Sequence, residues 1–355
     1  MSARIGGGAS VTSTSTSTST NYSKTMHRSV CAISFSFPRV FAAGVARIPA
    51  HSFSIMIKIL TGLRSSLKSS LIPALNRPSP RCLVAALPEG KGIPKIIHQT
   101  FYKTALPEAL ELNVTKLKKL NPDWEYRFYD DNGITSFITD NYPPSVLSYF
   151  NRIDGEYGAA KADLFRYLLM YKCGGVYLDI KSSANKPLDE TFKKDDVYLL
   201  SFWKNGKGDE FEGWGRHKEL SEFENGEFQQ WYIACAPGHP FLKAVIEGVL
   251  RNIDSYNPVL HGVGKHGVLR VTGPVAYTLA IQRLISDVGH RFVDSRAELG
   301  FEYSVYSSKA HTNLFKSHYS VLTRPIVKLG HIQRQTARLL NGLQKTRHFL
   351  TKRLS

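Results

Sequence analysis

The stretch Ala159–Lys181, AAKADLFRYLLMYKCGGVYLDIK, carries the strongest structural and chemical signals in this chain of 355 residues. Its first part has the apolar spacing of a helix, a Gly-Gly pair follows, and its last part alternates like a short strand. Two acidic residues and one arginine lie within it. Such groups could meet a negatively charged ligand that is rich in hydroxyl groups.

The helical part is expected to bury one face. Its apolar residues recur at helical spacing, at Ala162, Leu164, Phe165, Leu168 and Leu169. Asp163, Arg166 and Tyr167 are three and four residues apart, so we expect them to share the other face. Gly174 suits the C-cap, where a residue in the left-handed conformation ends the helix.

After Gly175 the apolar period becomes twofold, as in a strand. Successive strand side chains point to opposite faces. The two predicted faces are Val176, Leu178 and Ile180 on one side and Tyr177, Asp179 and Lys181 on the other. Asp179 and Lys181 would then stand side by side near the strand's end, which is where ligands bind in α/β folds.

These residues resemble the core of glycosyltransferase family 32, the group with the DXD sugar-binding region. The family pattern is a small residue, Asp, two spacers and Arg, followed by Gly-Gly-x-Tyr-x-Asp-x-Asp. The matching residues are Ala162, Asp163, Arg166, Gly174, Gly175, Tyr177 and Asp179. Lys181 departs from the pattern, because it stands in the place of the second Asp.

Four further segments are similar to family landmarks and follow the family's order between about residues 93 and 325. They are IPKIIHQT at 93–100, NPDWEY at 121–126, WYIACAPGHPF at 231–241 and TGP at 272–274. With the core motif, five pieces in order make the resemblance specific. It implies an α/β fold of the GT-A-like nucleotide-binding type.

The resemblance also implies roles for single residues. Asp163 would accept hydrogen bonds from sugar or ribose hydroxyls, Arg166 would contact the sugar or phosphate, and Asp179 would contribute to the metal or ribose site. The implied donor-binding residues are His98, Gln99, Tyr167, Gly174, Gly175, Tyr177 and Lys181. A divalent metal, with Mn²⁺ expected, would be held by Asp179 and His318.

The expected activity is that of a retaining glycosyltransferase. It would move a hexose, with mannose favoured, from a nucleotide-sugar donor to a glycan or to a lipid-linked acceptor such as inositol phosphoceramide. Lys181 motivates an alternative, a non-catalytic sugar-nucleotide-binding protein with a degenerate metal site. Its ammonium could contact phosphate as a point charge, pair with Asp179, or extend to solvent.

Simpler structural interpretations compete with these roles. Asp163 and Arg166 could form an exposed ion pair, which stabilises a helix by only roughly 0.2–0.5 kcal/mol. Asp179 could merely end the strand, and the Gly-Gly pair could be only a turn. His318 and the neighbouring His311 could be surface or packing residues.

The rest of the body is expected to alternate strands and helices. Strands are predicted at 93–99, 125–129, 197–200 and 232–236, and helices at 106–120, 146–150, 240–252 and 274–286. A turn is predicted at 130–133, and the irregular segment 205–225 is predicted to be a loop over the site. This alternation predicts a mostly parallel sheet with helices on both faces.

Charge separates the ends of the chain from its middle. The net charge is +17, but residues 1–88 and residues 303–355 each contain ten Lys or Arg and no acid. Residues 89–302 contain the remaining 26 of the 46 basic residues and all 29 acidic residues, which gives this segment a net charge of −3. The body is therefore slightly acidic, which excludes a basic nucleic-acid-binding fold. The four cysteines show no metal-ligand spacing and predict no disulfide framework.

Both ends are expected to serve placement rather than chemistry. Residues 1–88 form a Ser/Thr- and Arg-rich leader, disordered or similar to an organelle transit peptide. A membrane anchor is the alternative, although charged residues and a proline interrupt the best apolar run at 40–60. After a catalytic domain at 89–325, residues 326–355 suit a basic amphipathic helix, packed on the body or lying on a membrane surface. The family favours the Golgi or another endomembrane, and the leader offers organelle import instead.

Overall fold

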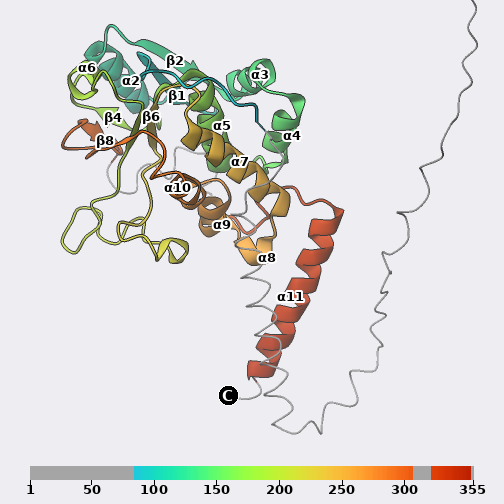
Figure 1. Ribbon diagram of the computed structural model, residues 1–355. Helices are drawn as coiled ribbons and strands as arrows, with labels where there is room; N and C mark the ends of the chain where they lie inside the picture. Colours follow the sequence, from blue (N-terminus) through green and yellow to red (C-terminus); the bar gives the residue numbers. More distant parts are fainter. Residues whose placement is uncertain (1–83, 307–320, 353–355) are drawn as a thin grey trace, which may run out of the picture. The chain divides into compact units, whose positions relative to one another are not determined.

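The computed structural model describes residues 84–306 and 321–352. The chain divides into two units, Met1–Phe53 and Ser54–Ser355, and every described residue lies in the second. The main sheet of this described part has six strands in the order β2-β1-β3-β6-β5-β7 (Figure 1). Their bounds are β1 Ile96–Thr100, β2 Glu125–Tyr129, β3 Gly175–Leu178, β5 Tyr198–Leu200, β6 Tyr232–Cys235 and β7 Arg291–Phe292. A separate two-stranded sheet pairs β4 (Ser183–Ala184) with β8 (Phe301–Glu302).

The main sheet is mostly parallel, as predicted. β1 pairs in parallel with β2 and β3, and β5 pairs in parallel with β7. The exception is β6, which runs antiparallel to β3 and to β5. The first residues of β6 therefore lie at the same edge of the sheet as the last residues of β3 and β5.

Helices cover both faces of the sheet, which confirms the predicted α/β class. Their bounds are α2 Glu108–Leu120, α3 Asp131–Asn141, α4 Pro144–Arg152, α5 Gly158–Cys173, α6 Leu188–Thr191, α7 Pro240–Ser255, α8 Pro258–His261, α9 Gly264–Val271, α10 Pro274–Gln282 and α11 His331–Lys352, with the 3-10 helix η4 at Lys218–Leu220. One core packs α3, α4, α5, α7, α9 and α10 on one face. A second core packs α2, α6 and the small sheet on the other.

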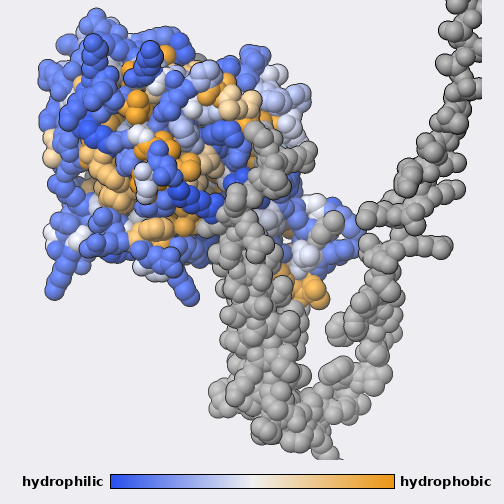
Figure 2. Space-filling model, viewed as in Figure 1, coloured by the Kyte–Doolittle hydropathy of each residue, from blue (hydrophilic) through white to orange (hydrophobic). Residues whose placement is uncertain are grey.

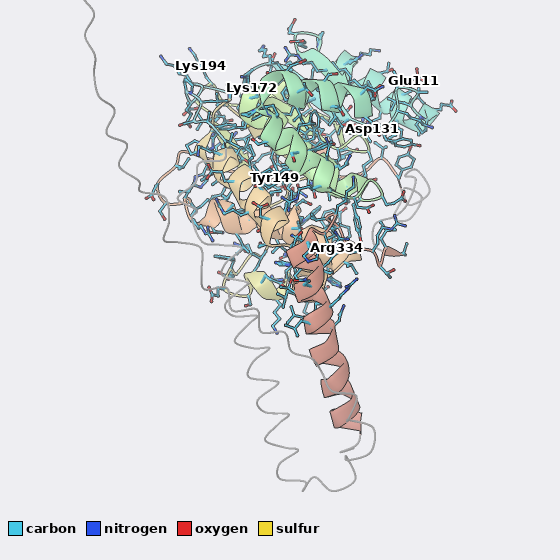
Figure 3. All side chains as sticks on the ribbon, turned by 90° about the vertical axis from the view of Figure 1, so that its right-hand side faces the viewer. Glu111, Asp131, Tyr149, Lys172, Lys194 and Arg334 are labelled. Atoms are coloured by element: carbon cyan, nitrogen blue, oxygen red, sulfur yellow. The ribbon has the colours of Figure 1, made fainter. Side chains whose placement is uncertain are left out.

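Charged residues lie at the periphery of this body. Glu111, Lys172 and Lys194, which Figure 3 labels, are exposed and point away from the interior. On the face that Figure 2 presents, hydrophobic residues gather toward the middle and hydrophilic residues form the margins.

Helix α5 differs from its expected amphipathic pattern. Asp163 and Arg166 were expected on a polar face, but both are buried, with relative exposures of 4% and 5%. The prediction of a solvated face is wrong because α5 contacts β3 as well as α3, α7 and α9. A helix that is packed on all sides shows no polar stripe toward solvent.

Gly174 and Gly175 form the corner between α5 and β3. Their φ angles are 64° and 96°, and Gly174 has ψ of −161°, a combination adopted almost only by glycine. A Cβ at Gly174 would come within 2.6 Å of the Pro237 nitrogen, and one at Gly175 within 2.5 Å of the Ile96 carbonyl oxygen. Both positions therefore require glycine for conformation and for space.

Several predicted elements differ in type or in bounds, among them the following three. Residues 130–133 do not form a free turn but begin α3, because the Asp130 side chain accepts a hydrogen bond from the Gly133 backbone at 2.7 Å. The strand predicted to reach Lys181 ends at Leu178, where its partner β6 begins at Tyr232. The predicted helix at 274–286 ends at Gln282.

Core packing continues past both expected boundaries of the catalytic domain. Val84 belongs to the larger core, and so do Ile326 and Val327. Gln333, in the first turn of α11, donates hydrogen bonds to the backbone carbonyls of Ile253 and Asp254 at the end of α7. The boundaries at 88 and 325 stay predictions. Of the helices described, none combines the length and apolar character needed to cross a membrane.

Candidate functional site

The site lies where β3 ends and β6 begins. Asp179 follows β3 directly, and its backbone nitrogen donates to the Trp231 carbonyl at 2.9 Å. Because β6 is antiparallel to β3, the residues before β6 return to this edge of the sheet. Helix α5 runs past the same edge and supplies the charged residues. The carboxyl ends of parallel strands are the usual ligand sites of such sheets.

Arg166 stands at the centre of the site. Its Nη1 lies 3.1 Å from Asp179 Oδ1, and its Nη2 lies 3.4 Å from Asp163 Oδ1. Nη1 also donates to the Gln230 carbonyl at 2.8 Å, and the guanidinium lies over the Tyr177 ring at 4.8 Å. These contacts come from three segments, α5, the end of β3 and the start of β6, and hold the guanidinium in one place. The structure thus brings together Asp163, Arg166, Tyr177 and Asp179, as the sequence predicted.

Asp163 is fully engaged by protein donors. Gln230 Nε2 donates to its Oδ1 at 3.2 Å, and Thr272 Oγ1 donates to its Oδ2 at 2.9 Å. Tyr167 completes this network by donating to the Gln230 side-chain oxygen and the Thr272 carbonyl, each at 2.9 Å. The alternative of an exposed ion pair with Arg166 is wrong, since the two side chains are 5% and 7% exposed.

The electrostatics of this pair follow from burial. Burial raises the pKa of Asp163, and the charge on Arg166 opposes that rise. For Arg166, burial acts to lower the pKa, but the neighbouring Asp179, Tyr177 and Asp163 more than offset it, so the pKa is raised. The guanidinium is therefore charged at any physiological pH, and it is the fixed positive charge of the site.

Asp179 is the accessible carboxylate of the site. Its side chain is 24% exposed. The contacts from Arg166 and from the Tyr177 hydroxyl, at 3.1 and 3.4 Å, both use Oδ1. Oδ2 accepts no hydrogen bond from the described residues. The Gln99 side chain donates to the Asp179 backbone carbonyl at 3.2 Å and so helps to hold the Asp179 backbone in place.

Lys181 neither extends to solvent nor pairs with Asp179 in the described part of the chain, and its expected contact with phosphate stays a prediction. It is 9% exposed, and its Nζ lies 3.9 Å from the centre of the Tyr303 ring, a cation–π contact. The structure records no ion pair between it and Asp179 among the described residues. Burial lowers the pKa of Lys181, Asp179 opposes this, and Arg166 adds to it. The ammonium is thus held close to the site without being neutralised there.

Three predicted donor-binding residues lie at the other end of β3. His98 donates from Nε2 to the Gly174 carbonyl at 3.0 Å, beside Gly175. Burial lowers the pKa of His98 to about 4, so this imidazole is neutral near pH 7. The observed contacts of these three residues are those of a packing corner, and their donor-binding role stays a prediction.

Gln230, Thr272 and Tyr303 were missed as site residues in the sequence. Gln230 and Thr272 bind both Asp163 and Tyr167 through side-chain or backbone atoms, and Tyr303 holds Lys181. A signal existed for two of them. Thr272 begins the TGP landmark, and Gln230 directly precedes the landmark at 231–241. Nothing in the sequence near Tyr303 indicated a role.

A metal would find one suitable ligand in the described residues. Their His, Cys, Asp and Glu side chains form no group of three or more that could hold a metal. Mg²⁺-like ions in nucleotide sites use one or two carboxylates together with phosphate oxygens and water. Asp179 fits that requirement, whereas Asp163 does not because protein donors occupy both its oxygens. His318 lies outside the described residues.

Comparison with known proteins identifies the family of this region. Residues 107–198 match the family described as glycosyltransferase sugar-binding region containing DXD motif. This segment, which includes α5, β3 and Asp179, is similar to that family. The resemblance to glycosyltransferase family 32 is thereby confirmed.

Two curated relatives bear names of mannose transfer. The chain is 29% identical over 197 residues to inositol phosphoceramide mannosyltransferase 2 of Schizosaccharomyces pombe, which covers 55% of this chain and 50% of that protein. It is 26% identical over 269 residues to initiation-specific alpha-1,6-mannosyltransferase of the same organism, covering 69% and 60%. The first match therefore spans about half the length of the relative.

A solved structure titled PaToxG glycosyltransferase is similar over 83% of this chain and 98% of its own, with a TM-score of 0.41 and 16% identity.

Proposed function

We propose that this protein is a retaining glycosyltransferase that moves a hexose, with mannose favoured, from a nucleotide-sugar donor to a glycan or glycolipid acceptor. The names of both relatives support mannose. The observation that carries the proposal is the array of buried Asp163 and Arg166 with the partly exposed Asp179, which meets where β3 ends and β6 begins. Such an array pre-organises one positive charge and one accessible carboxylate for a polar ligand.

The chemistry requires that the bond between the sugar's anomeric carbon and the diphosphate breaks. Positive charge then develops on the sugar ring and negative charge on the leaving phosphate. Arg166 would stabilise that negative charge, because its guanidinium is fixed before the donor arrives and needs no reorganisation. The acceptor hydroxyl would attack the face that the phosphate leaves and give its proton to the departing diphosphate, which retains the configuration and requires no carboxylate base.

Asp163 would be a positioning residue in this mechanism. Because Gln230 and Thr272 already donate to its two oxygens, its main effect is to hold Arg166 and the side chains of Gln230 and Thr272. Asp179 would contact the donor directly through Oδ2. Tyr177 and Gln99 would keep Asp179 in place from its side-chain and backbone sides.

A divalent cation, Mn²⁺ by preference, would be held by Asp179, the donor's phosphate oxygens and water. Its chemistry there would be to neutralise charge on the diphosphate. The Lys181 ammonium, which interacts electrostatically with Asp179 and occupies the motif position of the second Asp, would share that task. Lys181 also supports the second candidate function, a sugar-nucleotide-binding protein without turnover.

The surroundings of the enzyme are proposals as well. Endomembrane placement, with the Golgi favoured, is supported by the family, and organelle import through residues 1–88 is the alternative. A membrane surface is a candidate partner for α11, whose described residues Arg334 (labelled in Figure 3) and Arg338 are exposed. Basic residues near an anionic membrane contribute roughly 1 kcal/mol each.

The test is donor turnover by the full chain. GDP-mannose, UDP-galactose and UDP-glucose would be offered with and without Mn²⁺, and both sugar release and binding would be measured. We expect GDP-mannose turnover, and Asp179→Asn should lower it by about 10²–10³-fold. The exposed Asp140 on α3 offers the control Asp140→Asn. Tight binding of a nucleotide sugar without turnover would favour the binding protein, and neither binding nor turnover would refute both.

A further inference from the structure

The segment between β5 and β6 carries an aromatic cluster that the proposed mechanism does not use. The Trp214 ring lies 5.3 Å from Trp203, 5.2 Å from Phe211 and 5.9 Å from Tyr303, between ring centres. Trp214 is 47% exposed, whereas Trp203 is buried. In Figure 1 this segment is the yellow loop that extends from the sheet at the lower left. A large exposed aromatic ring that rests on buried ones is a candidate contact surface.

The loop holds Trp214 in a defined position. Asn205 Nδ2 donates to the Trp214 carbonyl at 2.6 Å, and Arg216 Nη2 donates to Asn205 Oδ1 at 3.1 Å. The Glu227 carboxylate accepts from Trp203 Nε1 at 2.9 Å and from His217 Nε2 at 2.6 Å. The platform is thus pre-organised, which lowers the entropic cost of binding a ligand on it.

Trp214 is connected to Lys181 through the Tyr303 ring. Its neighbour Tyr303 is the same ring that holds the Lys181 ammonium at 3.9 Å. Lys181 is two residues from Asp179 in the chain. The exposed indole therefore packs against the ring that holds Lys181, the residue at the motif position of the second Asp.

A buried polar atom beside the cluster lacks a partner in the described part of the chain. It is the indole nitrogen of Trp231, a residue that is 5% exposed. The Trp231 ring lies 5.6 Å from Tyr303. Buried polar atoms without partners are costly, and a ligand that offers hydroxyl groups would satisfy them.

We propose that Trp214 is the acceptor platform, on which the apolar face of a cyclic polyol stacks, either a hexose of a glycan or the inositol of a glycolipid headgroup. This rests on the proposed glycosyltransferase function and names the subsite for its second substrate. One face of such a ring presents C–H groups to the indole, while its hydroxyls remain directed outward. Indole combines a large apolar surface with few rotatable bonds, which favours such contacts.

The test compares acceptor kinetics of the full chain with its Trp214→Ala and Trp214→Phe variants. Methyl α-mannoside and myo-inositol 1-phosphate serve as the two acceptors. Trp214→Ala should raise the KM for the acceptor by about tenfold, while the KM for GDP-mannose changes by less than about twofold. Trp214→Phe should recover part of the loss because it keeps an aromatic face. Phe292, which is 49% exposed on β7, provides the matched control Phe292→Ala.

The possible outcomes distinguish a glycan acceptor from a lipid headgroup, and they show which result would overturn the proposal. An effect with the mannoside alone assigns a glycan acceptor, and an effect with the inositol phosphate alone assigns a lipid headgroup. An unchanged acceptor KM in Trp214→Ala overturns the platform. Loss of binding to phosphatidylcholine–phosphatidylserine vesicles, with acceptor KM unchanged, would instead make Trp214 a membrane contact.

Binding can be tested even if the enzyme shows no turnover. Saturation-transfer NMR of methyl α-mannoside or of myo-inositol 1-phosphate reports contact with the protein directly. Contact that is present in the native chain and lost in Trp214→Ala supports the platform when the proposed transferase activity fails. Equal contact in both proteins overturns it.

Discussion

Replacing Arg166 by Met tests whether the charged array is as buried as the structure describes. The change removes the guanidinium contacts to Asp163 and Asp179, the hydrogen bond to the Gln230 carbonyl and the contact with the Tyr177 ring. It leaves Asp163 buried with its strongest counter-charge gone. Breaking a buried ion pair from one side typically costs about 3–5 kcal/mol. We expect Arg166→Met to lower the free energy of unfolding by that amount.

The chain offers a closely matched control in Arg152. That arginine also pairs with a carboxylate, Asp254, at 2.6 Å, donates to a backbone carbonyl, that of Ile253, at 3.1 Å, and lies over a ring, that of Tyr149, at 5.3 Å. The difference is exposure, since the Arg152 side chain is 32% exposed and its partner 50%. Exposed pairs contribute about 0–1 kcal/mol, so Arg152→Met should cost far less than Arg166→Met.

Urea denaturation followed by far-ultraviolet circular dichroism measures both losses on the same scale. The double variant with Asp163→Asn adds a cycle, because removing both charges should cost less than the sum of the two single losses. If Arg166→Met costs no more than Arg152→Met, or if the two losses simply add, the buried and coupled arrangement is wrong.

Two other predictions follow from single contacts. Lys181→Asp restores the second motif carboxylate, so the Mn²⁺ concentration needed for half-maximal turnover should fall on the order of tenfold. Turnover in the presence of a chelator should drop below that of the native chain. Equal metal requirements in the two proteins would exclude a charge role for Lys181. Burial lowers the pKa of His98 from 6.5 to about 4. As the pH falls below about 6.5, His98 therefore becomes protonated in the unfolded protein before it does in the folded protein. The free energy of unfolding should fall accordingly, by about 2 kcal/mol at about pH 5. His98→Gln should flatten the pH dependence of the urea midpoint, and an unchanged slope would contradict the assignment.

Some features of the fold followed from spacing along the chain. The order helix, Gly-Gly and strand at 159–181 was predicted and is present as α5, the glycine corner and β3. The neighbourhood of Asp163, Arg166 and Tyr167 was predicted too, since residues three and four apart in a helix are adjacent whatever packs around them. The mostly parallel sheet followed from the alternation of strands and helices.

The sequence by itself therefore determined the local elements, the resemblance to a glycosyltransferase family and the charged residues in and directly after α5 and β3. Only the tertiary structure decided that α5 is buried on all sides, that Gln230 and Thr272 complete the array, and that Lys181 rests on Tyr303. The reason is physical. Periodicity shows which residues of one element share a face, but it does not show which distant element will cover that face. The partners Gln230 and Thr272 lie far along the chain from α5, and the antiparallel strand β6 and helix α9 place them beside it.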